Sequence, residues 1–217
     1  MRVDSSRRLK DIASASAAAE RVLESYGLDF CCHGEASLRE ACAAAAADVA
    51  AVERRLRACP ESAPPPWDDV TSLIDAIVRT YHVRTRRALA ETRATIEQLG
   101  SRALIEAFGA LDELALAQMD MEESLFRRVR ALANARLGRG PFPAPPFTTV
   151  HVHGGRLREG HARIHEALRR VQELAGAPEV DSAALRRRIK AISHAIHAQI
   201  HLENNELLPR AQALEPE

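Results

Sequence analysis

Four breaks rich in proline or glycine constrain the fold of this chain most, because they cut a helix-favouring sequence into segments of defined length. The breaks lie at residues 59–66, 100–101, 138–146 and 176–181. The run Pro64-Pro65-Pro66 cannot continue a helix, since proline lacks the amide donor and its ring clashes with the preceding turn. Residues 59–67 are therefore predicted to form a linker with polyproline character.

The segments between the later breaks are predicted to be four long helices, over residues 68–99, 101–136, 148–175 and 182–213. Alanine, leucine, arginine and glutamate dominate them, and all four favour helix. We find no convincing strand. Ser101 is expected to cap the second helix, and Asp181 or Ser182 the fourth. Long helices joined by short loops favour an all-α fold, an antiparallel four-helix bundle over residues 68–213.

A smaller unit precedes the bundle. Residues 1–58 are predicted to contain two or three short helices. A unit of this size is marginally stable alone, because it buries too small a share of its surface. We expect it to dock on the bundle or on another subunit, which leaves a homodimer open.

Composition excludes several classes of protein. The 217 residues include 30 basic and 30 acidic side chains, so the formal net charge is zero. Nucleic-acid binding is disfavoured, because it calls for a strongly basic face. No apolar run approaches the roughly 20 residues of a membrane-spanning helix, and the N-terminus has no apolar core of a secretion signal. The sequence thus predicts a cytoplasmic protein without a membrane segment.

Polar residues interrupt each of the four apolar seams at one place. The interruptions are His82, the pair Gln118 and Glu122, His161, and the pair Gln199 and Glu203. Residues four apart share one helix face, so each Gln and its Glu reach a common point. Six polar groups are therefore expected to face the interior of the bundle.

Two buried carboxylates would each cost several kcal/mol without compensation. A metal ion, a trapped proton or a hydrogen-bonded histidine can supply it. Facing carboxylates and imidazoles in a bundle core are typical of dinuclear metal sites, so metal binding is the favoured interpretation. A metal-free network of histidine and glutamate, or an error in the helical register, remains open.

Further histidines lie near this set in the sequence. His165 is one turn beyond His161 and is expected at the edge of the site. His194, His197 and His201 are expected on another face of the fourth helix, because their spacing does not match that of Gln199 and Glu203.

Two adjacent cysteines, Cys31 and Cys32, form a second candidate group. Neighbouring cysteines can bridge only through a strained ring, so a stable structural disulfide is not expected. In one interpretation they are functional thiols, which accept electrons, iron or a nitrosyl group or contact a partner protein. In the other they are reduced thiols that only pack the small unit. His33 is expected to lower the pKa of one thiol.

The order of these motifs resembles that of the iron–sulfur cluster repair di-iron proteins, which have a small domain with adjacent cysteines and a hemerythrin-like bundle. The resemblance covers nearly the whole chain. It rests on the segments Leu28-Asp29-Phe30-Cys31-Cys32-His33-Gly34, Tyr81-His82, Glu122-Glu123-Ser124-Leu125-Phe126, Gly160-His161 and Leu202-Glu203-Asn204-Asn205-Glu206-Leu207-Leu208-Pro209-Arg210.

The resemblance implies a ligand set that this chain matches only in part. In the family, four histidines and two bridging glutamates hold two irons. His82, His161, Glu122 and Glu203 match, whereas Gln118 and Gln199 stand where histidine is expected. The glutamines would act as weak ligands to Mn or Fe, or leave vacancies for water or an external ligand, or complete a metal-free site.

The resemblance also implies a function. The chain is expected to repair iron–sulfur clusters under nitrosative or oxidative stress, with iron–sulfur proteins as clients and non-haem iron, two per chain if the family pattern holds, in the core. Cys31 and Cys32 would be its reactive thiols. The alternatives are a sensor of nitric oxide or dioxygen with an altered or mononuclear site, and a metal-free interaction protein.

Overall fold

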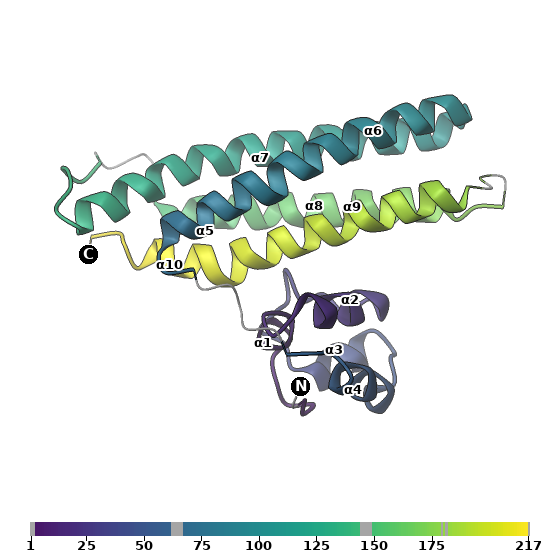
Figure 1. Ribbon diagram of the computed structural model, residues 1–217, viewed down its shortest axis with the longest axis horizontal. Coiled ribbons are helices and arrows are strands. Elements are labelled where there is room, and N and C mark those ends of the chain that lie inside the picture. The colour runs from purple at the N-terminus through teal and green to yellow at the C-terminus, as the bar shows by residue number, and fades with distance from the viewer. Residues whose placement is uncertain (1–2, 62–66, 144–148, 179, 181, 217) are drawn as a thin grey trace.

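Four long helices lie side by side in the computed structural model, with a smaller helical domain against one side of them (Figure 1). The structure describes residues 3–61, 67–143, 149–178, 180 and 182–216. Within these ranges the regular structure is helical, and extended pairing is limited to an isolated bridge between Arg8 and Ser37. The prediction of an all-α fold is confirmed.

The four bundle helices run in alternating directions along the long axis of the molecule, as Figure 1 shows. Their bounds are α5 Val70–Ala76, η1 Ile77–His82 and α6 Val83–Leu99, which form one continuous helix; α7 Arg102–Arg136; α8 Val150–Ala175; and α9 Ala183–Leu202, η2 Glu203–Leu207 and α10 Leu208–Gln212, which form another. These helices coincide closely with the four that the breaks predict.

The helix ends explain why the breaks work. Ser182 caps α9, because its hydroxyl accepts a hydrogen bond from the amide of Leu185 at 3.2 Å; Asp181 lies outside the described residues. Ser101 precedes α7 as predicted, but within the described chain its side chain makes no capping hydrogen bond.

Gly100 ends α6 in the left-handed conformation, with φ +69°, which glycine adopts without strain. The proline-rich residues 62–66 and 144–148 also lie outside the described ranges.

The N-terminal domain has four helices in its described part, not two or three. They are α1 Leu9–Ala13, α2 Ala17–Ser25, α3 Leu38–Ala44 and α4 Val49–Arg57. Local caps explain why more helices form than predicted. Ser16 caps α2, Ser37 and Glu40 form a capping box on α3, and Asp48 caps α4. Each cap satisfies amide groups that a short helix would otherwise leave unpaired.

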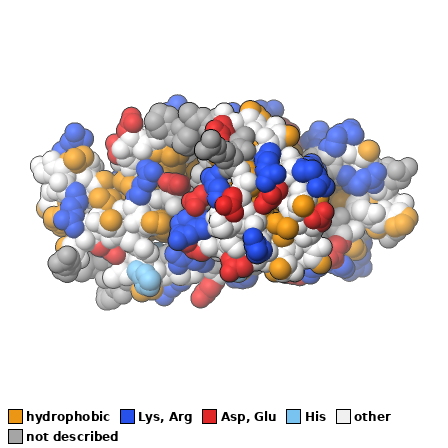
Figure 2. Space-filling model, turned by 90° about the horizontal axis from the view of Figure 1, so that it is seen from below, with side chains coloured by type: hydrophobic (Ala, Val, Ile, Leu, Met, Phe, Trp, Pro, Cys, Tyr) orange, Lys and Arg blue, Asp and Glu red, His pale blue; other side chains and the backbone are white. Residues whose placement is uncertain are grey.

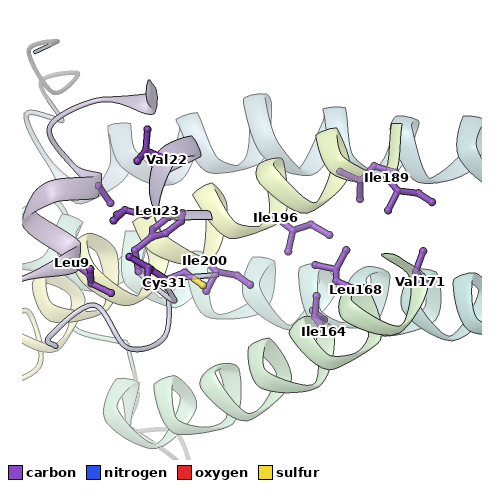
Figure 3. Close-up of a cluster of buried hydrophobic side chains, with 14 of the residues drawn as sticks. Leu9, Val22, Leu23, Cys31, Ile164, Leu168, Val171, Ile189, Ile196 and Ile200 are labelled. Atoms are coloured by element: carbon purple, nitrogen blue, oxygen red, sulfur yellow. The ribbon is translucent and has the colours of Figure 1, made fainter. Parts of the chain in front are cut away.

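This domain packs on α9 of its own chain. A single cluster of buried apolar side chains includes Leu23 and Cys31 of the domain together with Ile196 and Ile200 of α9, and Figure 3 shows both groups. The expectation that the domain docks on the bundle therefore holds. It also brings the Cys31–Cys32 segment to the wall of the bundle.

The surface carries mixed charge. On the face drawn in Figure 2, basic and acidic side chains are interspersed along the molecule. Of the helices in the described ranges, none is both long enough and apolar enough to cross a bilayer.

Candidate metal centre and thiol pair

Four of the predicted core residues converge at one point in the bundle. His82 ends η1, Glu122 lies in α7, His161 in α8, and Glu203 begins η2; all four are at most 1% exposed. Oε2 of Glu122 lies 3.1 Å from Nε2 of His82, and Oε1 of Glu122 lies 3.3 Å from Nε2 of His161. Each oxygen of Glu122 therefore faces a different imidazole, which is the arrangement that a bridging carboxylate requires.

Glu203 approaches the same point from another helix. Its Oε2 lies 3.1 Å from Nε2 of His161. One ligand atom each from His82, Glu122 and Glu203 lie within 4.8 Å of one another, so a single ion can contact all three. Glu122 and Glu203 thus both lie between the two histidines, as the register of the seams predicts.

Two of these four side chains lie at the ends of π-helical stretches. His82 is the last residue of η1 and Glu203 is the first of η2. A π-helical turn displaces the residues around it from the ordinary helical register, and such turns are frequent at functional sites. The α-helical periodicity used on the sequence does not predict them.

The two glutamines behave differently. The amide nitrogen of Gln199 donates to Oε2 of Glu122 at 3.0 Å and to Oε1 of Glu203 at 3.1 Å, so it joins the two carboxylates. The amide of Gln118 instead donates to the backbone carbonyl of Leu157 at 3.4 Å. The structure therefore brings Gln199 into the polar centre and turns the amide nitrogen of Gln118 toward α8.

A small cavity lies beside the glutamines. Its volume is about 10 Å³, and its lining includes Gln118, Gln199, Glu122 and His161. This is close to the smallest space that admits a water molecule. The glutamines thus leave space for about one water molecule next to Glu122.

The two histidines have unequal support. Nδ1 of His82 lies 3.1 Å from Oε1 of Glu123, which also contacts Arg86 at 3.4 Å. Nδ1 of His161 is buried and has no hydrogen-bond partner among the described residues. A carboxylate behind a ligating imidazole fixes its orientation and raises its basicity. The His82 side is therefore the better organised half of the site.

The charges of the site are strongly coupled. Burial alone would raise the pKa of Glu122, but hydrogen bonds from His161 and His82 outweigh it and hold that pKa below its usual value. Burial and the charge of Glu122 raise the pKa of Glu203 to about 7. Despite burial, hydrogen bonds to both carboxylates raise the pKa of His161 to about 10. Protons thus supply the compensating charge, and a metal that replaces them would release them.

Several buried atoms remain available to a metal. Oε1 of Gln199 and Oε2 of Glu203 have no aligned hydrogen bond among the described residues. They adjoin two imidazole nitrogens and a carboxylate in one enclosed place. Nitrogen and oxygen donors of this kind suit iron and manganese. The residues present therefore fit a metal centre, richer in oxygen donors than a set with four histidines.

The adjacent cysteines are free thiols whose sulfur atoms lie 3.8 Å apart. Asp29 organises them, because its Oδ1 accepts from the amide of Cys32 at 2.8 Å and from the amide and the thiol of Cys31, each at 3.2 Å. Asp29 was not among the predicted site residues. An acidic residue two positions before the pair, able to accept from following amides, was the available signal.

The two thiols differ in acidity. The hydrogen bond between the two thiols lowers the pKa of Cys32, and the charges of His161 and His33 add to this effect. The hydrogen bond with Cys32, together with burial, raises the pKa of Cys31 well above its ordinary value. Cys32 is therefore the more acidic of the two thiols. The prediction that His33 lowers the pKa of one thiol is confirmed for Cys32, and the exposed ring of His33 also pairs with Asp29 at 2.7 Å.

Two asparagines tie the thiol segment to the metal centre. Asn204 and Asn205 follow Glu203 directly, and their amide nitrogens donate to the carbonyl of Cys31 at 3.1 and 3.3 Å. In the sequence, this Asn pair stood out only as part of a family motif. Two adjacent asparagines inside a helical segment are unfavourable for helix and were the signal of another role.

The outlying histidines need one correction. His165 does not reach the edge of the metal centre; its Nδ1 lies 3.2 Å from Nε2 of His197 instead. The ring of His165 thus turns toward α9 and away from the group around Glu122. His194, His197 and His201 do lie on another face of α9, as predicted: His201 contacts Ser14 at 3.1 Å, and His194 and His197 contact Glu24.

Comparison with known proteins agrees with this arrangement. Residues 73–211 match the hemerythrin HHE cation binding domain, and residues 5–59 match a domain of unknown function, ScdA_N. The iron-sulfur cluster repair protein YtfE of Musicola paradisiaca is 26% identical over 94% of this chain and 96% of its own length. The protein of the same name from Salmonella paratyphi B is 28% identical, with the same coverage of both chains.

Proposed function

The chain belongs to the iron–sulfur cluster repair family, with a hemerythrin HHE domain behind a ScdA-type domain, and from this premise we propose that it repairs damaged iron–sulfur clusters. Its clients are iron–sulfur proteins, and the cytoplasm suits that role. We keep the proposed division into a thiol domain at 1–58, a linker at 59–67 and a bundle at 68–213.

One observation carries this proposal: Glu122 presents its two oxygens to two different buried imidazoles, with Glu203 beside them. His82 and His161 would each hold one metal ion, and the two carboxylates would bridge. Bound iron would supply exchangeable iron or redox chemistry at this place. Gln199 would have to turn its amide so that Oε1, now without a hydrogen bond in the described structure, faces the ion.

The order in which metal ions would bind follows from the unequal support of the two histidines. His82 has Glu123 behind it, whereas Nδ1 of His161 lacks such support in the described structure. We infer that the first iron binds on the His82 side, and that a second ion, on the His161 side with Gln118 nearby, binds more weakly. Two irons per chain, one iron, manganese or an empty site are the outcomes that metal analysis distinguishes.

The thiols would act next to this centre. Cys32 is the more acidic thiol, and the charge of His161 contributes to its acidity, so a negative sulfur can form close to the metal centre. Thiolates bind iron and nitrosylated iron well. We propose that Cys32 accepts or hands over iron, while Cys31 stabilises the thiolate through its hydrogen bond.

The test joins metal content to repair. Protein purified without oxygen is analysed for iron by mass spectrometry, and is then added to a client whose [4Fe–4S] cluster has been damaged by nitric oxide. Wild-type protein should carry iron and restore client activity. Glu122→Gln removes the bridging carboxylate, so this variant should lose most of its iron and most of its ability to restore client activity.

The matched control is Glu113→Gln, an equivalent change at an exposed position of α7. It should retain iron and repair. A folded Glu122→Gln variant that repairs as well as the control would contradict the proposal. Repair by wild-type protein without any metal would transfer the activity to the thiol domain alone.

A second function is favoured by the cavity of about 10 Å³ beside Glu122 and His161. A metal with a vacancy there could bind nitric oxide or dioxygen as a sensor, without repair. Infrared spectroscopy of the nitric oxide adduct checks this directly. A stable adduct in protein that fails to restore clients would support sensing instead of repair.

A further inference from the structure

A second cluster of metal-ligating side chains lies outside the centre described above, where α8, α9 and the thiol domain meet. We propose that His165 and His197 form a separate binding site for a divalent transition-metal ion such as Zn²⁺ or Fe²⁺, with Glu24 behind His197. The site does not depend on the metal content of the bundle core, because it shares no side chain with it.

The spacing of the two rings suits a common ion. Nδ1 of His165 lies 3.2 Å from Nε2 of His197. Two imidazole nitrogens that bind one tetrahedral zinc at about 2.0–2.1 Å lie about 3.3 Å apart. The ligand atoms are thus already at the required separation, and an ion placed beside them replaces the contact between the rings.

Glu24 fixes the tautomer that metal binding needs. Its Oε1 lies 3.1 Å from Nδ1 of His197, so that nitrogen carries the proton and leaves the lone pair on Nε2. Although burial alone would raise the pKa of Glu24, hydrogen bonds from His194, His197 and Ser193 hold it at about 2. An ionised carboxylate behind a histidine whose other nitrogen is free is the usual support of a metal-binding imidazole.

The site is open to an ion and to further ligands. His165 is exposed, whereas His197 is 9% exposed. Both line a cavity of about 520 Å³ whose walls also include Asp29, Phe30 and Cys31. Water or a small anionic or thiol ligand in this cavity can complete the coordination that two histidines leave unfilled.

The position of the ion would let it strengthen the contact between the thiol domain and the bundle. His165 and His197 come from two bundle helices, and Glu24 comes from α2 of the thiol domain. Metal binding strengthens the link from α8 through His197 to Glu24. It therefore holds the thiol domain on the bundle more firmly.

The test is a Zn²⁺ titration of the full chain, as purified, by calorimetry. Wild-type protein should bind one more Zn²⁺ per chain than the His165→Gln variant. His165 is exposed, so this variant should fold normally, which circular dichroism checks. The matched control is His151→Gln, a change at another exposed histidine of α8, which should bind as wild type does.

A second variant tests the supporting carboxylate. Glu24→Gln keeps both ligands but weakens the support of His197, so Zn²⁺ should bind at this site about tenfold more weakly with unchanged stoichiometry. Equal Zn²⁺ stoichiometry and affinity in His165→Gln and His151→Gln would overturn the proposal. It would show that the two rings share only a hydrogen bond. Both compared variants change histidines outside the bundle core. Their difference in Zn²⁺ binding therefore tests this site whether or not the core holds iron, and whether or not the protein repairs clusters.

Discussion

At the scale of single residues, the identity of the groups facing the core decides what the protein can bind. The register of apolar seams suffices to predict His82, Glu122, His161 and Glu203, since residues at helical spacing share a face. It cannot predict which way an amide turns. Gln199 joins the two carboxylates, whereas Gln118 donates to the backbone of Leu157, and only the packing of neighbouring helices decides this.

The glutamines provide the first prediction. The double change Gln118→His and Gln199→His should raise iron occupancy towards two per chain, because imidazole is a far better ligand than a carboxamide. Iron per chain by mass spectrometry, on protein purified without oxygen, is the measurement. An unchanged iron content in a folded double variant would show that these two positions do not face the metals.

The carboxylate behind His82 provides the second. Glu123→Gln should weaken metal binding about tenfold, since the side chain no longer draws the proton of Nδ1 and leaves a less basic ligand. Asp120→Asn is the control, because Asp120 is exposed and also contacts Arg86, at 2.8 Å. Competition with a chelator compares the two; equal affinities would remove Glu123 from the account of the site.

At the scale of helices, the proline and glycine breaks determine the bundle segments so strongly that their ends follow from the sequence. The N-terminal helices do not follow as readily, because helices of five to nine residues depend on individual caps more than on periodicity. The π-helical stretches η1 and η2 are also beyond such an analysis. They depend on tertiary packing around the buried site, and a search for the α-helical period of 3.6 residues cannot detect a π-helical turn.

The segment between Cys31 and α3 provides the third prediction. A Cβ on Gly34 would lie 2.8 Å from the carbonyl oxygen of Phe30 and 2.8 Å from Oδ1 of Asn205. Gly34→Ala should therefore destabilise the protein by about 1–3 kcal/mol and loosen the thiol segment. Gly155→Ala, in α8, meets open space and should stabilise by up to about 1 kcal/mol.

Thermal unfolding of both variants is the measurement, together with the rate at which a thiol reagent modifies Cys32. Gly34→Ala should react faster than wild type, and Gly155→Ala at the wild-type rate. Similar stability and reactivity in the two variants would mean that the loop adjusts without cost.

At the scale of the whole molecule, the thiol domain and the bundle act as one unit because α9 contacts both. Its inner face carries Gln199, and Glu203 follows it, whereas His194, His197 and Ser193 hold Glu24 of the domain. The sequence predicted that the domain docks on the bundle or on another subunit, but not where. Histidines off the core seam were the hint, and their partner Glu24 is about 170 residues away along the chain.

The docking contact gives the fourth prediction, on pH. The pKa of Glu24 is depressed to about 2 from 4.5, so its contribution is complete above pH 4.5 and disappears as the pH falls through 2. At about 1.4 kcal/mol per pH unit, the drop from 4.5 to about 2 corresponds to about 3.4 kcal/mol, and solvent screening of this partly buried carboxyl group reduces the expected contribution to about 2 kcal/mol. Wild-type protein should exceed Glu24→Gln in unfolding free energy by this amount at pH 6, and the difference should shrink steadily towards pH 2.

Denaturant titrations of both proteins at each pH measure the difference. The neighbouring Glu20, whose pKa burial raises to about 7, acts in the opposite sense in both proteins and largely cancels from the comparison. A difference that stays constant from pH 6 to pH 3 would show that Glu24 acts through packing and not through its charge.

The shared helix α9 has a consequence for how such a chain can vary over evolutionary time. A single inserted or deleted residue rotates everything beyond it by about 100°. In α9 that rotation would misalign the ligands on one side and the anchor of the thiol domain on the other, in the same event. A length change in α9 would therefore damage both contacts at once, so we expect this helix to vary by substitution alone, whereas the connection between α8 and α9 can change in length.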